Sequence, residues 1–138
     1  ERSTAPHFVE EVQQSIWEAE HLVIVYPLWL GTMPALLKAF LEQVLRPGFA
    51  FEKGLPGKLW KKRLSGRSAR VIVTMGMPAF FFRWFYFAHG LRSLERNILS
   101  FCGFGPVRDC IIGMVEEPSD RRRRDWLLKI ERLGKAAA

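Results

Sequence analysis

The sequence predicts an α/β fold in which helices cover both faces of a parallel β-sheet. Apolar runs typical of strands alternate along the chain with helical patterns, and two of these runs are apolar on both faces, as strands buried in a parallel sheet are. A length of 138 residues with 49% hydrophobic residues suits one domain with a continuous core. We therefore assign residues 1–138 to a single domain.

The first third of the chain predicts a helix, a strand and a second helix. Apolar residues recur at helical spacing over 8–19, so a helix is expected to end near Glu20. Residues 21–26 are rich in β-branched side chains and predict a buried parallel strand. An apolar stripe over 34–46 predicts an amphipathic helix, with Thr32 as its cap.

The rest of the chain continues the alternation after a long connection at residues 47–67, of a length usually functional or mobile. A second buried strand is expected over 69–74 and a helix over about 90–101. A third strand is expected over 107–114, and Ser119 or Asp120 can cap a last helix that runs to about Leu133.

The net charge of +7 is concentrated in the middle of the chain, where residues 46–92 carry ten basic side chains and one acidic side chain. Such a patch can meet nucleic acid, an anionic membrane surface or a phosphorylated cofactor, or it can be a solvated face. The basic run at 121–124 is flanked by Asp120 and Asp125 and is expected to open a helix. We therefore expect no nucleic-acid partner.

The two cysteines, Cys102 and Cys110, form neither a CxxC pair nor a cluster with histidine, so we expect no metal site. Two reduced, mostly buried thiols are typical of a cytoplasmic protein. The longest apolar stretch, at 22–31, is too short to span a bilayer, so no transmembrane segment is expected.

Two loops at the carboxyl ends of predicted strands are the candidate ligand contacts, because open parallel sheets bind ligands at that edge. The first loop contains Pro27, Leu28, Trp29 and Leu30. The flat face of Trp29 suits a planar aromatic ligand, and the alternative is that this side chain packs on the neighbouring helix.

The second loop contains Thr74, Met75, Gly76 and Met77. A glycine here lets a ligand approach the backbone closely, and the alternative is an ordinary turn. The sequence lacks a GxGxxG loop, a P-loop, a GxSxG elbow and a convincing pair of acid–base carboxylates, so we assign no catalytic residue. A bound cofactor would then carry the chemistry.

The stretches HLVIVYPLW at 21–29, MPALLK at 33–38 and GFAF at 48–51 resemble the flavodoxin-like NAD(P)H:quinone oxidoreductase family. This family includes DT-diaphorase-type enzymes and the ancillary flavoproteins of potassium efflux systems. The similarity extends through residues 66–74 and 101–108, which together with the first stretches cover nearly all of the chain. The resemblance implies a flavodoxin-like three-layer α/β/α fold.

The resemblance also implies a function, namely two-electron hydride transfer from NAD(P)H through FMN or FAD to a quinone or similar acceptor. The family's two flavin-contacting loops correspond here to residues 27–30 and 74–77, although Met75 and Met77 depart from the Thr-Thr-Gly-Gly that members often have. A tyrosine and a histidine near the family's hydride-transfer site are not carried over, because Tyr86 and His89 do not have the expected spacing. The alternative function is a regulatory module of an ion-efflux system.

Seven aromatic residues occur between Phe80 and Phe87, broken by Arg83 alone. This cluster can wall the flavin slot, form a dimer contact or belong to the local core, and an exposed share would mark an interface. Since family members are commonly dimers, the resemblance implies a homodimer.

The resemblance also bears on the extent of the domain. The family fold begins with a strand, a phosphate-binding loop, a helix and a second strand that are not found here, and the predicted strands correspond to its third, fourth and fifth. We therefore expect the C-terminal part of a flavodoxin-like domain, with an exposed apolar edge at 22–26 and weak or no binding of flavin by the chain as given.

Overall fold

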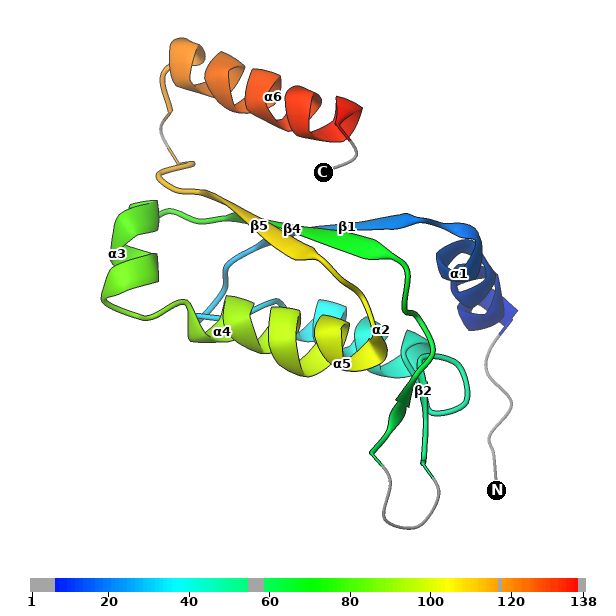
Figure 1. Cartoon of the computed structure of the whole chain (residues 1–138). Coiled ribbons are helices and arrows are strands. Elements are labelled where there is room, and N and C mark those ends of the chain that lie inside the picture. Colours follow the sequence, from blue (N-terminus) through cyan, green and yellow to red (C-terminus); the bar gives the residue numbers. More distant parts are fainter. Residues whose placement is uncertain (1–6, 55–58, 117, 137–138) are drawn as a thin grey trace.

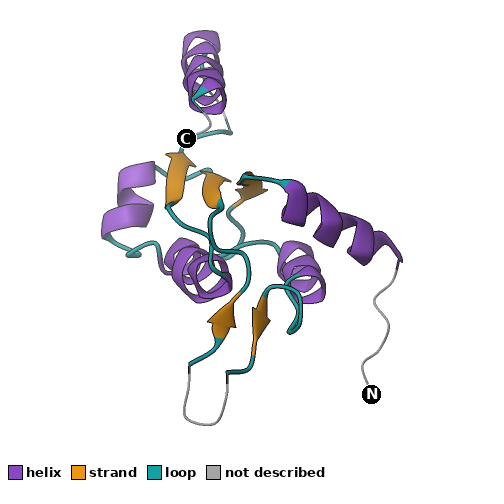
Figure 2. Cartoon of the chain, turned by 45° about the vertical axis from the view of Figure 1, so that its right-hand side comes forward, coloured by secondary structure: helices purple, strands orange, loops and turns teal. Residues whose placement is uncertain are grey.

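The fold is built on a parallel β-sheet, seen in a computed structural model that describes residues 7–54, 59–116 and 118–136 (Figures 1 and 2). The sheet of the described residues has the strand order β1-β4-β5, with β1 at His21–Pro27, β4 at Ser68–Thr74 and β5 at Val107–Ile112. Residue Pro27 pairs with Thr74, and Thr74 pairs with Ile112. The three strands therefore end level with one another.

Helices lie on both sides of this sheet, which confirms the predicted fold class. One face is covered by α2 (Ala35–Val44) and by a continuous helical segment of α4 (His89–Arg92), the π-helix η1 (Ser93–Leu99) and α5 (Ser100–Cys102). Helix α6 (Asp120–Lys135) lies over the opposite face (Figure 1). Helix α1 (His7–Glu18) lies beside β1 (Figure 2).

The hydrophobic core lies between the sheet and the α2 side. Strand residues Ile24, Val71 and Val73 pack there against buried leucines and valines of the helices, including Val44 and Leu94. Strand β4 is central, and five of its seven residues are buried. Burial of both its faces explains why its sequence is apolar without alternation.

Strand β1 differs from the prediction of a fully buried strand. Ile24 and Tyr26 are 8% and 3% exposed, but Val23 and Val25 on the other face are 51% and 62% exposed. The helix layer covers one face of β1, whereas α6 lies farther away on the other side (Figure 1). The apolar edge that the sequence predicts at 22–26 is therefore present in the structure.

The long connection contains a small antiparallel hairpin that the sequence analysis missed, with β2 at Phe51–Glu52 and β3 at Lys61–Lys62. The hairpin strands are too short to show a period in the sequence. Aromatic packing holds this hairpin to the helix layer, since the Phe101 ring of α5 lies 4.9 Å from Phe51 and 6.3 Å from Trp60.

One of the two predicted helix caps is confirmed by the structure, and the other is wrong. The Ser119 hydroxyl accepts a hydrogen bond from the Arg122 N–H at 3.3 Å, which confirms Ser119 as the cap of α6. The prediction of Thr32 as the cap of α2 is wrong, because Pro34 occupies that position without a side-chain cap bond. Thr32 is held instead in a tight turn with Trp29.

Two of the basic side chains in residues 46–92 make contacts within the protein. Arg63 forms an ion pair with Glu52. Arg67 lies 4.9 Å above the Trp17 ring, and its side chain donates hydrogen bonds to the carbonyl oxygens of Ile16 and Trp17 in α1. These two basic side chains are therefore part of the packing between the hairpin, α1 and the sheet.

Both cysteines are free and buried, as predicted. Burial raises the pKa of the Cys102 thiol to about 11, so this group is protonated at neutral pH. Among the described residues, none of the helices has the length and apolar character needed to cross a membrane.

Candidate functional site

The carboxyl ends of the three strands are joined by backbone hydrogen bonds that continue past the strands themselves. The Leu28 N–H donates to the Thr74 carbonyl at 2.7 Å, and the Met75 N–H donates to the Ile112 carbonyl at 2.9 Å. The two loops predicted from the sequence therefore lie side by side at one edge of the sheet. This edge is where open parallel sheets bind ligands.

The first loop is a tight turn that exposes Trp29. The N–H of Trp29 donates to the carbonyl of Thr32 at 3.0 Å, and the reverse bond is 3.1 Å. Leu30 and Gly31 form the tip with φ of 48° and 80°, the pattern of a type I′ turn. Trp29 is 62% exposed, so the alternative that it packs against the neighbouring helix is wrong.

The second loop turns its carbonyl groups inward. The carbonyl oxygen of Met75 accepts a hydrogen bond from Val115, and that of Met77 accepts one from Met114, each at 3.2 Å. The N–H groups of Gly76 and Met77 take no part in these bonds. Met75 is 3% exposed, so the accessible part of this loop centres on Gly76 rather than on the methionine side chains.

A third loop, residues 113–116, completes this edge and was not predicted. A Cβ atom on Gly113 would lie 2.5 Å from the Ala79 nitrogen, so only glycine permits this close packing against the second loop. A Cβ on Gly76 would lie 2.5 Å from Oε1 of Glu116, which places that carboxylate directly over the second loop. Gly113 falls inside the strand predicted over 107–114, but β5 ends at Ile112, so the last two residues of that prediction are wrong. This glycine is the only signal for the loop in the local sequence.

The aromatic cluster is mostly exposed and partly helical. Helix α3 (Ala79–Trp84) was not predicted, because seven aromatics in eight residues leave no helical period to detect. Phe82 is 1% exposed and anchors the segment, whereas its other aromatic members are between 40% and 77% exposed. The Phe81 and Phe85 rings stack at 4.9 Å with an interplanar angle of 5°. The interpretation as local core is therefore wrong for all of the cluster except Phe82.

The aromatic segment is joined directly to the Trp29 turn. A Cβ on Gly90 would lie 2.4 Å from the Gly31 carbonyl oxygen and 2.8 Å from the Thr32 Cα. Just before this contact, Phe87 and Ala88 have φ of 54° and 49°, a left-handed conformation that non-glycine residues rarely adopt. Backbone strain of this kind occurs most often at functional sites.

A group of ionisable side chains lies under the sheet behind this edge. Arg83 of α3 forms an ion pair with Asp109 of β5. Burial, with a smaller contribution from the Asp109 carboxylate, raises the pKa of Glu95. Burial and the Glu95 charge raise the pKa of Tyr26 to about 12.

Tyr86 and His89 are both exposed on the surface of the aromatic segment.

Cavities occur elsewhere in the described part of the chain. One of about 200 Å³ lies near the amino ends of the strands, between α1, Leu22 and Phe104. Another of about 200 Å³ lies in the helix layer between α2 and η1. Neither of these two cavities is lined by residues of the three loops.

Comparison with known proteins shows that this chain is similar to flavodoxin-like proteins and to quinone dehydrogenases. A sequence profile for the flavodoxin-like fold matches residues 1–132. A ribosyldihydronicotinamide dehydrogenase [quinone] from Pongo abelii is 32% identical over 133 residues, which cover 90% of this chain and 54% of the relative. This chain thus spans about half the length of the curated relatives it matches.

Solved structures agree with the sequence match. An NAD(P)H:quinone oxidoreductase from Methanothermobacter marburgensis superposes with a TM-score of 0.79 and 26% identity, over 96% of this chain and 64% of that protein. General stress protein 14 from Treponema denticola, solved in complex with FMN, superposes with a TM-score of 0.67 and 26% identity, over 91% of this chain and 72% of that protein. The chain belongs to the flavodoxin-like fold family, as its sequence resemblance predicted.

Proposed function

We propose that the three-loop edge of the sheet is a flavin site, and that the chain serves the two-electron reduction of a quinone, or a similar acceptor, by NAD(P)H. The observation that carries the proposal is the juxtaposition of the exposed Trp29 turn with the Gly76 turn. The names of the quinone dehydrogenase relatives and the FMN complex of a similar fold support it.

The residues at this edge fit a flat, electron-rich ring system. The N–H groups of Leu30 and Gly31 take no part in the two bonds that close the first turn, and those of Gly76 and Met77 take no part in the bonds that fix the second. Backbone N–H donors of this kind suit the carbonyl oxygens and nitrogens of an isoalloxazine. The exposed Trp29 ring adds an apolar wall.

The two loops and the aromatic segment have different roles in this proposal. The residues Pro27, Leu28, Trp29 and Leu30 would hold one side of the flavin, and Thr74, Gly76 and Met77 would hold its edge. Met75, also predicted for this role, is buried, and its backbone groups are bonded to Ile112 and Val115. The aromatic segment beside the turn would exclude water from the site. A bound flavin, FMN or FAD, would supply the hydride chemistry that the protein's own side chains lack.

Flavin binding tests the proposal at Trp29. We expect FMN fluorescence to be quenched on titration with the chain, at an affinity that is weak for the chain as given, and Trp29→Ala to weaken that affinity about tenfold. Trp60→Ala is the matched control, because this half-exposed tryptophan packs on Phe51 in the hairpin. Quenching that is equal in the wild type and in Trp29→Ala would remove Trp29 from the site.

Turnover separates the proposed enzyme from the alternative module. NADH and NADPH are each offered, together with a soluble benzoquinone and either FMN or FAD, to the longest natural protein that contains this chain. Flavin-dependent quinone reduction supports the enzyme. Flavin binding without turnover, combined with binding to a membrane transport protein, supports the regulatory module of an ion-efflux system instead.

We also propose that the protein forms a homodimer through the aromatic segment. Phe80, Trp84 and Phe85 are 68%, 77% and 64% exposed and lie close together in sequence. Exposed apolar patches of this kind usually mark contact surfaces. A second copy of the chain at this surface would also screen the Trp29 turn from water, because Gly90 ties the segment to that turn.

We propose the cytoplasm as the site of action. Cys102 and Cys110 are both free and buried in the described structure. Reduced thiols of this kind persist where glutathione and thioredoxin keep the compartment reducing, and NAD(P)H is available there as a reductant.

A further inference from the structure

Helix α6 opens with the basic run at residues 121–124, which has no part in the proposed flavin site. The sixteen residues of this helix include seven basic and three acidic side chains, and none of them is buried. Cations in a first turn lie at the positive end of the helix dipole, where they are unfavourable. Helix stability therefore does not account for the position of this run.

Half-buried side chains identify the face of α6 that is turned toward the rest of the molecule. Trp126, Ile130 and Leu133 are half-buried, and their spacings of four and three residues place them on one side of the helix. The opposite side carries a second series at helical spacing, in which all five residues are exposed. This series, which we call the outer stripe, consists of Arg121, Arg124, Leu128, Arg132 and Lys135.

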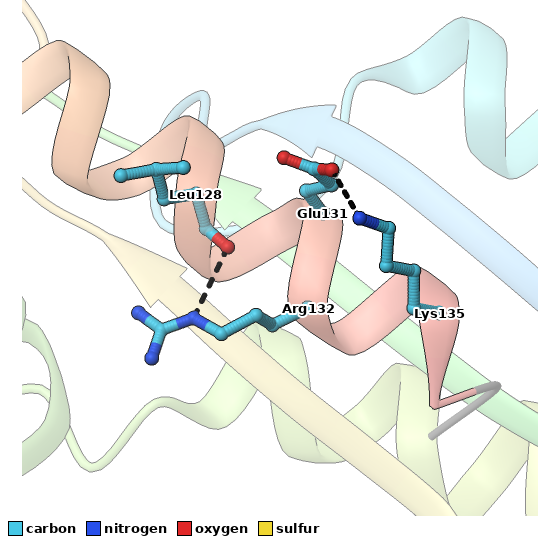
Figure 3. Close-up of polar contacts among 4 residues, drawn as sticks. All are labelled: Leu128, Glu131, Arg132 and Lys135. Atoms are coloured by element: carbon cyan, nitrogen blue, oxygen red, sulfur yellow. Dashed lines mark hydrogen bonds and ion pairs between the residues drawn. The ribbon is translucent and has the colours of Figure 1, made fainter.

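The positive charge of the outer stripe is neutralised only in part within the helix. Lys135 pairs with Glu131 at 2.6 Å (Figure 3). Arg132 donates from its Nε to the Leu128 carbonyl at 3.3 Å, which is a neutral partner (Figure 3). The side chains of the two arginines near the start of the stripe form no ion pair or hydrogen bond among the described residues. Three of the four cations in the stripe therefore keep their charge free for a partner.

The outer stripe begins at the end of the molecule that carries the candidate site. The loop at 113–116 belongs to the candidate site, and α6 starts shortly after it at Asp120. Figure 1 shows the start of α6 at the same end of the sheet as α3. A surface that binds the start of the stripe would therefore lie at the end of the molecule where the candidate site opens.

We propose that the outer stripe of α6 docks the protein on an anionic lipid surface. Its arginine and lysine side chains would contact the headgroups, and Leu128 would reach the boundary between headgroups and acyl chains. A cluster of four or more basic side chains on a helix is typical of proteins that bind anionic lipids. The cytoplasmic leaflet of a membrane carries such lipids, in agreement with the cytoplasmic location proposed above.

The exposed leucine in the stripe favours a lipid surface over a nucleic acid. Leu128 is 54% exposed and lies one helical turn from both Arg124 and Arg132. The phosphate backbone of a nucleic acid offers charged and polar groups, whereas a lipid interface offers phosphate groups together with apolar ones. A lipid surface therefore matches every member of the stripe.

Docking on a membrane also bears on the acceptor, and in this respect the inference rests on the proposed function. Quinones with long apolar tails dissolve in the bilayer rather than in water. A protein docked through α6 would have its candidate site close to that supply, because the start of α6 and the site share one end of the molecule. Lipid binding itself needs neither flavin nor quinone, so the two proposals can fail separately.

Cosedimentation with lipid vesicles tests the proposal. The chain is mixed with vesicles of phosphatidylcholine alone, or of phosphatidylcholine and phosphatidylserine in equal parts, at low and at physiological salt. We expect binding to the mixed vesicles, little binding to phosphatidylcholine alone, and a loss of binding as salt is added. Absence of binding to the mixed vesicles at low salt overturns the proposal. If FMN still binds in that case, the proposed flavin site stands without the docking surface.

A matched pair of variants separates the outer stripe from the general positive charge of the chain. The double variant Arg121→Gln, Arg124→Gln should weaken partitioning into the mixed vesicles about fivefold for each cation removed, since glutamine keeps the helix propensity of arginine. The double variant Lys61→Gln, Lys62→Gln removes the same charge from the exposed strand β3 and should change partitioning far less. An equal loss in the two variants overturns the proposal.

Two further measurements distinguish a lipid surface from a nucleic acid. Leu128→Gln should weaken partitioning into the mixed vesicles about fivefold at constant charge, because it removes the apolar contact. Partitioning of Leu128→Gln equal to that of the wild type overturns the proposal. Binding of the wild type to duplex DNA that is tighter than its binding to the mixed vesicles at the same salt also overturns it, in favour of a nucleic acid.

Discussion

At the scale of single residues, the contact between Gly90 and the Trp29 turn determines how the candidate site is assembled. A Cβ at position 90 would lie 2.4 Å from the Gly31 carbonyl oxygen, which is backbone and has little room to move. Gly31 itself needs a left-handed φ of 80°. The shape of the turn and the position of the aromatic segment therefore depend on each other.

Substitution of Gly90 tests this dependence. We expect Gly90→Ala to lower the free energy of unfolding by about 1–3 kcal/mol, because a methyl group must displace backbone. Gly134→Ala is the control: no atom lies within 4 Å of that Cβ, and alanine favours a helix by up to about 1 kcal/mol. Urea denaturation measures both variants, and equal stability of Gly90→Ala and wild type would contradict the close contact.

Tyr26 offers a second residue-scale prediction, because its buried hydroxyl has no hydrogen-bond partner among the described residues. A buried hydroxyl without a partner costs about 1–3 kcal/mol, so Tyr26→Phe should leave the free energy of unfolding unchanged or raise it. Burial is the larger cause and the Glu95 charge the smaller cause of the raised pKa of Tyr26, about 12 against a reference of 10.0.

The pH dependence of Tyr26 follows from this shift. Between pH 10 and 12 the unfolded state loses the tyrosine proton before the folded state does, so ionisation favours unfolding and the wild type loses stability as pH rises. Tyr26→Phe lacks this contribution, and its stability advantage over the wild type should grow across that range. Urea titrations at several pH values measure the difference, and a constant difference would contradict the buried site of Tyr26.

At the scale of elements, the sequence predicted the strands of the main sheet and the amphipathic helices well. Continuous apolar runs such as Val71–Val73 and a regular apolar stripe such as that of α2 follow from local periodicity. The elements that were missed lack such a period. Hairpin strands β2 and β3 have two residues each, and four of the six residues of α3 are aromatic.

The candidate site was predictable where it follows directly from strand ends. Trp29 and Gly76 come immediately after apolar strands, so their proximity follows from the parallel topology. The loop at 113–116 and the role of Gly90 depend on packing between distant segments, which no local pattern records. The exposure of Val23 depends on what covers β1, which local composition does not reveal either.

Helix α6 is the element whose stability depends most on local contacts. A helix of 16 residues without buried positions is marginal in water, so its cap matters more than in a packed helix. We expect Ser119→Ala to cost about 1 kcal/mol of helix stability and to speed amide exchange in the first turn of α6. Thr32→Ala is the control, because Thr32 does not cap α2, and an equal loss of protection in α2 would contradict the assignment of caps.

At the scale of the whole molecule, the exposed aromatic segment predicts self-association. We expect the protein to sediment as a dimer and the double variant Trp84→Ser, Phe85→Ser to sediment as a monomer, because it removes two of the most exposed rings. The matched control replaces Leu127 and Leu128 on α6, which have similar exposure. Dissociation by the control alone, or a wild type that is monomeric throughout, would contradict this surface.

The strand order gives β4 a particular place in the folding of the chain. β4 lies between β1 and β5 in the sheet. Ile24 of β1 pairs with Val71 of β4, which is 47 positions later in the sequence, and Val71 pairs with Asp109 of β5, a further 38 positions on. The pairs that β4 makes with β1 and with β5 therefore join segments that lie far apart in the sequence. Pairing over such separations is slow compared with helix formation, so we expect the helices to form before this sheet does.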